Sequence, residues 1–509
     1  MKDIIMFLFG YLVFFYSASL VASYIAMCVL AYFQMRNSYN AKKDPLLMDD
    51  IKNNPNIPGV SIVAGAYNEG ALVVECVESF LHQDYPLYEV VIVNDGSTDN
   101  TLELMIEHFD LVESDEEYIV RIPTKPFKRL FRSTNPQYSN LKVVDKINGG
   151  TKSDSINAGL NAAQYPYFIN TDVDCILSYD AIIQCIRPVL EDSSIIAVSG
   201  AMAMNNGCTV AHGHITQRNV SHKPVPLFQS VEYLRSYFLG KMAWSQLNAM
   251  PNVSGGYGLF DTQLVISAGG YNPTSFAEDM DMLIRMVTYC CHTNRKYRVV
   301  QIPATCCWTQ GPPNYKVLSR QRVRWGRGLI QTFHLYSNVV FNRKYRQMGT
   351  LTLPYVLIFE FAAPIIEFVG LLTFIYLAVT GAINWITCVV MLSAIILFGI
   401  FIATITFLYD FLQERTYGKT RAYLWMFLAC ILEPVFYHPF VVFCSLRGYY
   451  NYILNTRAVW GAMTRDAINT QAETNKKSHN TEPAPSIVNN PEPAPSIVNN
   501  IESNTAAQA

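Results

Sequence analysis

The chain has 509 residues, which is too long for one compact domain and indicates two or more structural units. Half of its residues are hydrophobic and only 15% are charged, whereas an ordinary soluble protein carries about 25% charged residues. The formal net charge of −2 gives no electrostatic support for nucleic-acid binding. Its twelve cysteines contain no CxxC pair, which argues against a zinc or redox motif and favours reduced thiols.

An apolar run over residues 4–33 predicts a transmembrane helix within residues 1–35. About 30 apolar residues can cross a bilayer with some tilt, and they exceed the hydrophobic region of a signal peptide. Arg36 is the first of three basic residues that follow the run, and Lys2 alone precedes it. The positive-inside rule therefore places residue 36 onward in the cytosol.

Residues 58–340 are expected to form a cytosolic α/β domain. Two short apolar runs, 60–64 and 89–93, predict strands, and a helix-like stretch, 71–82, lies between them. A further predicted strand over 167–170 runs directly into acidic residues. This spacing indicates a parallel sheet, whose ligands bind at the carboxyl ends of the strands.

Polar side chains follow the first two predicted strands. Ala66, Tyr67 and Glu69 follow the first strand, and Glu69 either contacts a nucleoside or caps the next helix. Asp95 follows the second strand within Asn-Asp-Gly-Ser-Thr-Asp. It can accept hydrogen bonds from a base or ribose, although the same pattern also makes a turn and a helix cap.

Two later segments suit a diphosphate and its metal ion. A glycine-containing loop over 148–152 ends at Lys152, which is either a phosphate ligand or a solvated surface lysine. Asp172 and Asp174 follow the strand over 167–170, where a turning chain can bring both carboxylates together. Two carboxylates with phosphate oxygens are hard ligands suited to Mg²⁺ or Mn²⁺, and a solvated acidic turn is the alternative.

Glu278 and Asp279 precede a helical stretch over 280–287. A carboxylate at a helix start that faces a cleft can take the proton from an acceptor hydroxyl. The alternative is a residue that caps the helix.

Gln321, Arg324 and Trp325 lie at positions i, i+3 and i+4 of a predicted interfacial helix near residues 316–340, so they share one face. Arg324 can bind phosphate oxygens with two donors, and Trp325 offers a flat surface for a sugar ring. The alternative is a basic amphipathic helix on the membrane surface, and both can hold. In either case the flanking Arg320, Arg322 and Arg327 are expected near anionic headgroups.

Residues 351–446 predict about three further transmembrane helices, at 351–380, 384–410 and 421–446. Two prolines interrupt the last of these, which is either a complete crossing or a re-entrant segment. The tail over 467–509 is polar, repeats a nine-residue motif twice and is expected to be disordered.

Together and in this order, these motifs resemble the processive family-2 glycosyltransferases over roughly residues 58–460. That group includes the cellulose, hyaluronan, chitooligosaccharide and poly-N-acetylglucosamine synthases. Segments 228–235 and 254–260 are most similar to the bacterial poly-N-acetylglucosamine branch. Gln310 is a departure, because the corresponding position often carries Glu in that group.

The resemblance implies an α/β GT-A (Rossmann-like) domain inserted between transmembrane helices, and inverting transfer from a UDP-sugar with Mg²⁺ or Mn²⁺. It assigns donor binding, metal binding, catalysis and acceptor–diphosphate binding to positions of this sequence. The donor-binding residues are Ala66, Tyr67, Glu69, Asp95, Lys152 and Asp172, and the metal ligands are Asp172 and Asp174. Asp279 is the general base, with Glu278 beside it. The acceptor and the diphosphate are bound by Gln321, Arg324 and Trp325.

The expected function is polymerisation and export of a β-linked exopolysaccharide at the plasma (inner) membrane. The expected partners are a UDP-sugar, a growing glycan or lipid acceptor, membrane lipids and export subunits, without nucleic acid. Two alternatives remain at this point: a transferase that adds one sugar to a lipid or short glycan, and an inactive export or scaffold subunit. The motifs do not identify the sugar or the linkage.

Overall fold

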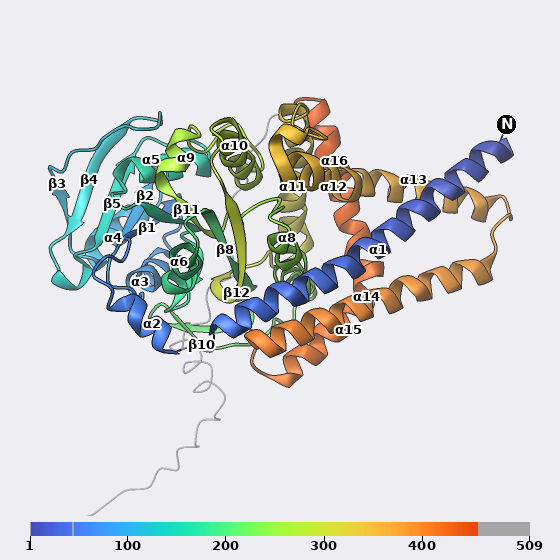
Figure 1. Ribbon diagram of the computed structural model, residues 1–509, viewed down its shortest axis with the longest axis horizontal. Helices are drawn as coiled ribbons and strands as arrows, with labels where there is room; N and C mark the ends of the chain where they lie inside the picture. Colours follow the sequence, from blue (N-terminus) through green and yellow to red (C-terminus); the bar gives the residue numbers. More distant parts are fainter. Residues whose placement is uncertain (1, 43–44, 457–509) are drawn as a thin grey trace, which may run out of the picture. The chain divides into compact units, whose positions relative to one another are not determined.

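A ten-stranded mixed sheet lies at the centre of the computed structural model, which describes residues 2–42 and 45–456 (Figure 1). The predicted disordered tail over 467–509 lies outside the described residues. In spatial order the strands are β3 (Leu111–Ser114), β4 (Phe127–Ser133), β5 (Leu141–Lys146), β2 (Tyr88–Asn94), β1 (Val60–Ala66), β6 (Tyr167–Asp172), β11 (Tyr257–Asp261), β8 (Ile195–Met204), β12 (Arg298–Thr309) and β7 (Cys175–Leu177).

The strands predicted from apolar runs are confirmed as β1, β2 and β6. β1 lies between β2 and β6 and is parallel to both. Their side chains are almost all buried, as expected for strands covered by helices on both faces. All three carboxyl ends therefore meet at one edge of the sheet.

Most helices of the α/β domain connect or cover these strands. They are α2 (Pro45–Lys52), α3 (Val73–Leu81), α4 (Thr101–His108), α5 (Lys152–Ala162), α6 (Ala181–Glu191), α7 (Pro224–Leu234), the π-helix η2 (Arg235–Lys241), α8 (Met242–Gln246), α9 (Thr262–Ser267), α10 (Glu278–His292) and α11 (Tyr315–Leu335). A small hairpin joins β9 (Thr209–Ala211) to β10 (His214–Gln217). The expected α/β GT-A arrangement between apolar helices is confirmed.

Three described helical spans are long and apolar enough to cross a membrane: Gly10–Ser38 within α1 (Lys2–Lys42), Met348–Val379, and Trp385–Gln413, which is α14. α15 (Thr420–Phe436) and α16 (His438–Ile453) form a pair bent by 51°, the geometry of a broken span or a re-entrant loop. Pro439 follows the bend, where its missing N–H and fixed φ suit the first turn of a new helix.

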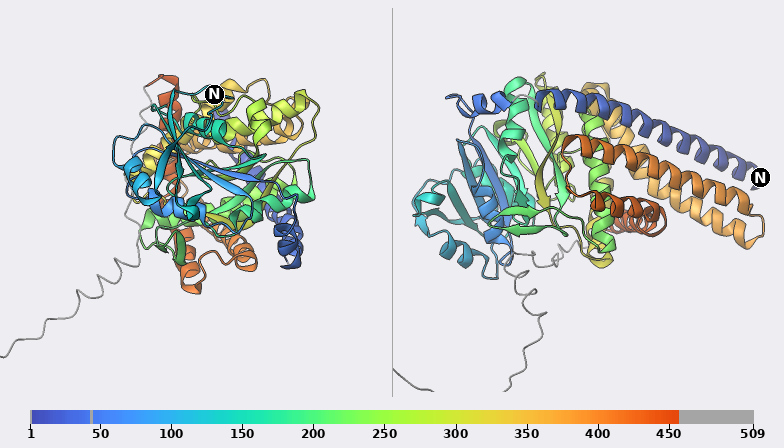
Figure 2. Two further views of the ribbon diagram at one scale, coloured as in Figure 1. Left: turned by 90° about the vertical axis from the view of Figure 1, so that its left-hand side faces the viewer. Right: turned by 90° about the horizontal axis from the view of Figure 1, so that it is seen from below.

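The N-terminal helix packs against the C-terminal hydrophobic block. Helices α1 and α14 lie side by side in Figures 1 and 2, and the Tyr409 hydroxyl donates to the Cys28 carbonyl at 2.8 Å. Two spans almost 350 residues apart in the sequence therefore belong to one helical assembly.

Helix α11 crosses α16 at a contact between glycines. A Cβ at Gly326 would lie 2.7 Å from the Ser445 carbonyl oxygen, and a Cβ at Gly448 would lie 2.6 Å from the Val323 carbonyl oxygen. Any larger residue would push the helices apart, as in the small-residue contacts of membrane helices. The helix that carries Gln321, Arg324 and Trp325 is thus fixed directly to the hydrophobic block.

The prediction that Arg322 and Arg327 lie near lipid headgroups is wrong. Arg322 is 4% exposed and donates to both Glu232 carboxylate oxygens at 2.8 and 2.7 Å. Tyr437, at the α15–α16 bend, donates to the same carboxylate at 2.6 Å. Arg327 is also buried and donates to the Thr456 carbonyl at 2.6 Å. Helical periodicity correctly groups the residues of a face, but it does not reveal that α7 and α16 cover this one.

We expect Arg322→Met to lower the stability of the protein by about 2–4 kcal/mol, because it leaves Glu232 partly buried without its counter-ion. We expect a value in the lower part of that range, because the Glu232 side chain is 27% exposed and water can partly solvate it. Thermal unfolding in detergent measures the change.

The matched control is Arg298→Met. Arg298 and Asp192 form an ion pair whose side chains are 47% and 33% exposed, so its loss should cost less than about 1 kcal/mol. Equal shifts of the unfolding midpoint in the two variants would show that burial does not strengthen the Arg322 pair.

Candidate active site

The carboxyl ends of β1 and β2 form one end of the candidate site. Asp95 is buried, its N–H donates to the Ala66 carbonyl at 2.9 Å, and its Oδ1 accepts from Lys146 Nζ at 2.5 Å and from the Gly149 N–H at 2.9 Å. Lys146 is itself fully buried and also contacts Asp154 Oδ2 at 2.6 Å. These contacts fix the Asp95 carboxylate in one orientation. Ala66 contributes its main chain, because its side chain is in the core.

The loop after β1 is tied to the loop after β2. Asn68 has a left-handed backbone, with φ of 57°, and its Oδ1 accepts from the Thr98 N–H at 2.8 Å. The Glu69 N–H donates to Thr101 Oγ1 at 2.9 Å, and the helix expected from residue 71 begins at Val73. Tyr67 is half exposed at the tip of this loop. Its ring is available to a ligand at the edge where Asp95 lies.

The loop over 148–152 links this end of the site to the acidic pair on β6. Its Gly149 N–H reaches Asp95, and Lys152 Nζ pairs with Asp172 Oδ1 and donates to the Gly255 carbonyl at 2.6 Å. Burial opposes the charge on the ammonium group, but the Asp172 and Glu278 carboxylates hold the pKa of Lys152 above its usual value. One ammonium group therefore lies between the two acidic motifs.

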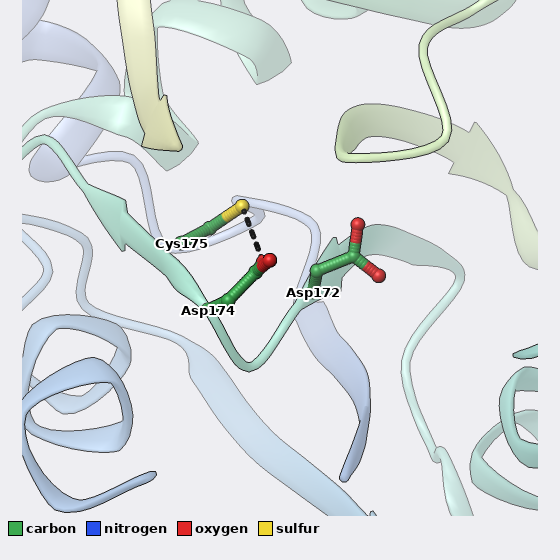
Figure 3. Close-up of side chains that lie close together, drawn as sticks. All are labelled: Asp172, Asp174 and Cys175. Carbon is green, nitrogen blue, oxygen red and sulfur yellow. Dashed lines mark hydrogen bonds between the residues drawn. The ribbon is translucent and has the colours of Figure 1, made fainter. Parts of the chain in front are cut away.

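Asp172 ends β6, Asp174 lies in the turn that follows, and Cys175 begins β7 (Cys175–Leu177). In Figure 3 the Asp174 carboxylate lies against the Cys175 thiol, and the Asp172 carboxylate extends beside them, directed away from Asp174. The donor atoms of the three residues all lie within 4.8 Å of one another. Two carboxylates in this arrangement fit Mg²⁺ or Mn²⁺, with phosphate or water oxygens as further ligands. The Lys152 ammonium shows that the position already stabilises a cation.

A glycine pair missed by motif reasoning brings the acidic motifs close. Gly255 and Gly256 precede β11, and the Gly256 carbonyl accepts from Thr171 Oγ1 at 3.0 Å. A Cβ at Gly255 would contact Glu278 Oε1 at 3.5 Å, and one at Gly256 would clash with Met202 Cε at 2.5 Å. A side chain at Gly255 would thus be in ordinary contact with Glu278, whereas one at Gly256 would require the end of the flexible Met202 side chain to move.

Glu278 and Asp279 begin α10 and face different partners. Glu278 is buried and pairs with Arg324 Nη1 at 3.4 Å. Burial raises the pKa of Glu278, an effect that Arg324 opposes and Asp279 adds to. Asp279 Oδ2 accepts from Asn252 Nδ2 at 2.7 Å. Asn252 was not predicted, because nothing in its local sequence indicates that it reaches α10.

Lys241, at the end of η2, is a second residue that the sequence did not reveal. It is buried, and its Nζ lies 4.8 Å from the centre of the Tyr237 ring. Burial lowers the pKa of Lys241 to about 8, and the Asp279 carboxylate opposes that shift. Because it lies within an apolar stretch of the sequence, only the tertiary structure shows that it lies near Asp279.

Helix α11 contributes Arg324 to the charged cluster. Trp325 is 39% exposed, and the Arg322 guanidinium lies 4.1 Å from the centre of its ring. Across residues 2–42 and 45–456, Gln321 and Trp325 make no hydrogen bond or ion pair with the acidic motifs. The structure therefore brings together Lys152, Asp172, Glu278 and Arg324 and leaves the other two residues on the adjoining helical face.

Comparisons with known proteins relate this chain to glycosyltransferases. Residues 61–250 match the family model Glycosyl transferase family 2, and residues 180–411 match Glycosyl transferase family group 2. The poly-beta-1,6-N-acetyl-D-glucosamine synthase of Staphylococcus aureus (strain COL) is 25% identical over 314 residues, covering 62% of this chain and 64% of that protein. The synthase of the same name from Staphylococcus epidermidis is 26% identical over 273 residues, or 53% of this chain and 55% of that protein. The matched region thus spans less than two thirds of these relatives.

Among solved structures, a mannosyltransferase from Pyrobaculum calidifontis in complex with GDP-Man and Mn²⁺ is similar, with a TM-score of 0.46 and 19% identity. The likeness covers 83% of this chain and 98% of that one.

Gly328→Ala tests the contact that places α11 against the start of α10. The new Cβ would lie 2.6 Å from Ala277 Cβ and 2.9 Å from the Ala277 nitrogen, so the backbone must shift. We expect a loss of about 1–3 kcal/mol, as for overpacking in a core, measured by thermal unfolding.

Gly370→Ala is the matched control, because no atom lies within 4 Å of a Cβ at that helical position. Both substitutions gain the same helix preference of about 0.5–1 kcal/mol, so their difference isolates the clash. A Gly328 variant as stable as the Gly370 variant would contradict the close contact.

Proposed function

We propose that this chain is a family-2 glycosyltransferase related to polysaccharide synthases, and that it polymerises a β-linked polysaccharide from a UDP-sugar by inverting transfer. The proposal places the enzyme in the plasma (inner) membrane with its catalytic domain in the cytosol. Its domains are an N-terminal helix within 1–35, the transferase domain over 58–340, membrane helices within 351–446 and a tail over 467–509.

The observation that carries the proposal is the position of Lys152. Its ammonium group pairs with Asp172 and lies within electrostatic range of Glu278. Glu278 in turn forms an ion pair with Arg324. Alternating positive and negative groups from β6, α5, α10 and α11 thus form one continuous cluster. In a nucleotide-sugar, the diphosphate on one side of the breaking sugar–phosphate bond is negatively charged. Lys152 and Arg324 are two cationic groups that can bind it.

The donor would lie along the loop over 148–152. Asp95, oriented by Lys146 and the Gly149 N–H, would accept hydrogen bonds from the nucleoside, with Tyr67 beside it. Ala66 and Glu69 would complete this end, through the main chain that positions Asp95 and through the loop after β1. Lys152, three positions after Gly149, would then reach the diphosphate.

Asp172 and Asp174 would hold a divalent cation, Mg²⁺ or Mn²⁺. When bound, such an ion offsets the negative charge that develops on the departing diphosphate. Lys152 would remain beside it as a second cation that touches the same leaving group.

Asp279 is better suited than Glu278 to act as the general base. Glu278 is buried and neutralised by Arg324, which suits a residue that positions the cluster. Asp279 lies in the first turn of α10 and makes no ion pair with Arg324 among the contacts of the described residues. The amide of Asn252 holds one of its oxygens, as a base must be oriented toward the hydroxyl that it deprotonates.

The acceptor would approach along the exposed face of α11. Trp325 offers its ring to a sugar, and Gln321 lies one turn before it. Because α11 is packed on α16 through glycines, a growing chain that leaves this face meets the membrane helices directly. Lipids surround those helices, and export subunits would act beyond them.

The decisive experiment is sugar incorporation by the purified full chain in nanodiscs, with Mg²⁺ or Mn²⁺ and a panel of radiolabelled UDP-sugars. A high-molecular-weight product from one donor supports the proposal and identifies the sugar. A short product on a lipid or glycan acceptor would replace processive synthesis with single addition. Absence of both UDP release and transfer with every donor would favour an inactive subunit.

Asp279→Asn should reduce transfer by about 10²–10⁴-fold, because the variant loses the group that takes the acceptor proton. UDP binding should be almost unchanged, since the base acts in the transition state and does not touch the donor. Turnover and UDP affinity measured on the same preparation separate the two effects.

Asp281→Asn is the matched control on the same helix. Asp281 is buried and accepts from the Tyr336 hydroxyl at 2.8 Å, so its loss should reduce stability more than turnover. Transfer by the Asp279 variant at near the wild-type rate would remove that residue from the base role.

A further inference from the structure

A cysteine thiol completes the acidic pair at the end of β6. Cys175 is fully buried, and its Sγ lies 3.4 Å from Asp174 Oδ1 (Figure 3). Together with Asp172, these residues place one sulfur and two carboxylates within 4.8 Å of one another.

The separation between sulfur and oxygen is that of two ligands on one ion. Metal–oxygen bonds of about 2.0–2.2 Å and metal–sulfur bonds of about 2.3 Å hold neighbouring donors roughly 3.0–3.7 Å apart. The 3.4 Å between Cys175 Sγ and Asp174 Oδ1 falls within that range. The two atoms need not move apart for both to bind one cation, and the metal–sulfur bond would replace the hydrogen bond from the Cys175 thiol to Asp174.

A second thiol lies next to the first. Cys307, on β12, forms a hydrogen bond with Cys175, and the two sulfurs lie 3.8 and 3.9 Å from the Gly256 carbonyl oxygen, respectively. In the strand pairing, Cys175 lies opposite Thr309, so the two cysteines are diagonal neighbours. Diagonal Cα atoms are about 7–8 Å apart, which is too far for a disulfide and leaves both sulfurs as thiols.

We propose that Cys175 is a sulfur ligand at the cation site of Asp172 and Asp174, so that this site binds a thiophilic divalent cation such as Zn²⁺ or Co²⁺ in preference to Mg²⁺. The inference rests on the proposed function for the identity of the cation site. Carboxylates alone suit Mg²⁺, whereas a mixed oxygen and sulfur set favours the softer ions. The thiol releases its proton to solvent as the metal–sulfur bond forms.

A consequence for the enzyme follows from competition. A thiophilic ion at this position occupies the ligands that would hold the catalytic cation. Zn²⁺ therefore inhibits sugar transfer at concentrations far below the Mg²⁺ concentrations that support it.

The test is a Co²⁺ titration of the purified full chain, without UDP-sugar or acceptor. Binding through sulfur gives a thiolate-to-cobalt charge-transfer absorption in the near ultraviolet. We expect this band in the wild-type protein, its displacement by Zn²⁺, and its loss in Cys175→Ser. Zn²⁺ affinity, measured by competition, should fall at least about tenfold, the smallest loss that removing even an outer-shell partner of a ligand produces.

Cys290→Ser is the matched control, since Cys290 is a buried thiol on α10 and belongs to no metal-binding group among the described residues. That variant should keep the band. Asp174→Asn keeps Cys175 and should lose the band, which guards against a fold defect specific to the cysteine variant. Unfolding midpoints without metal, equal to wild type, confirm that each variant is folded.

Three results would overturn the inference: no charge-transfer band in the wild-type protein, an unchanged band in Cys175→Ser, or a band that disappears only in Cys307→Ser. Because the titration contains no sugar donor, a failed inference leaves polymer synthesis with Mg²⁺ intact. A Co²⁺ band in a protein that makes no polymer would instead contradict the proposed function and leave the sulfur ligand standing.

Discussion

The placement of one ammonium group between two sets of carboxylates organises the site. Lys152 pairs with Asp172, donates to the Gly255 carbonyl and lies close enough to Glu278 for both carboxylates to favour its charged form. Without that charge, the carboxylates of β6 and α10 would repel one another across a buried gap. The backbone at Gly255 lies beside both motifs, because its carbonyl accepts from Lys152 and a Cβ there would touch Glu278 at 3.5 Å.

The sequence predicted the parts of this arrangement that depend on local chain geometry. Strands β1, β2 and β6 are evident from apolar runs, and parallel pairing places the residues that follow them at one edge. The sequence therefore predicts that Asp95 and Asp172 lie at the same edge, whereas Lys152 was expected near a diphosphate only from its glycine-containing loop. The face shared by Gln321, Arg324 and Trp325 follows in the same way from helical spacing.

Tertiary contacts decided the rest. Asn252 donates to Asp279 from a segment whose sequence resembles an ordinary loop. Lys241 lies within electrostatic range of Asp279, in a segment that resembles an apolar helix. The sequence predicts Arg322 as a surface charge, but Glu232 on α7 and Tyr437 at the α15–α16 bend cover it in the structure. Periodicity identifies which residues share a face, but what covers that face depends on chain segments about a hundred residues away.

The glycine contact between α11 and α16 has a mechanical consequence. Backbone meets backbone at Gly326 and Gly448, so no layer of compliant side chains can absorb a sliding motion between the two helices. The depth at which the bilayer holds α16 therefore sets the height of Trp325 above the headgroups. Tilting of the hydrophobic helices, the usual response to a thicker or thinner bilayer, would move α11 and Trp325 together with α16 as one rigid body. Bilayer thickness would then act on the position of Trp325 through the helix contact alone.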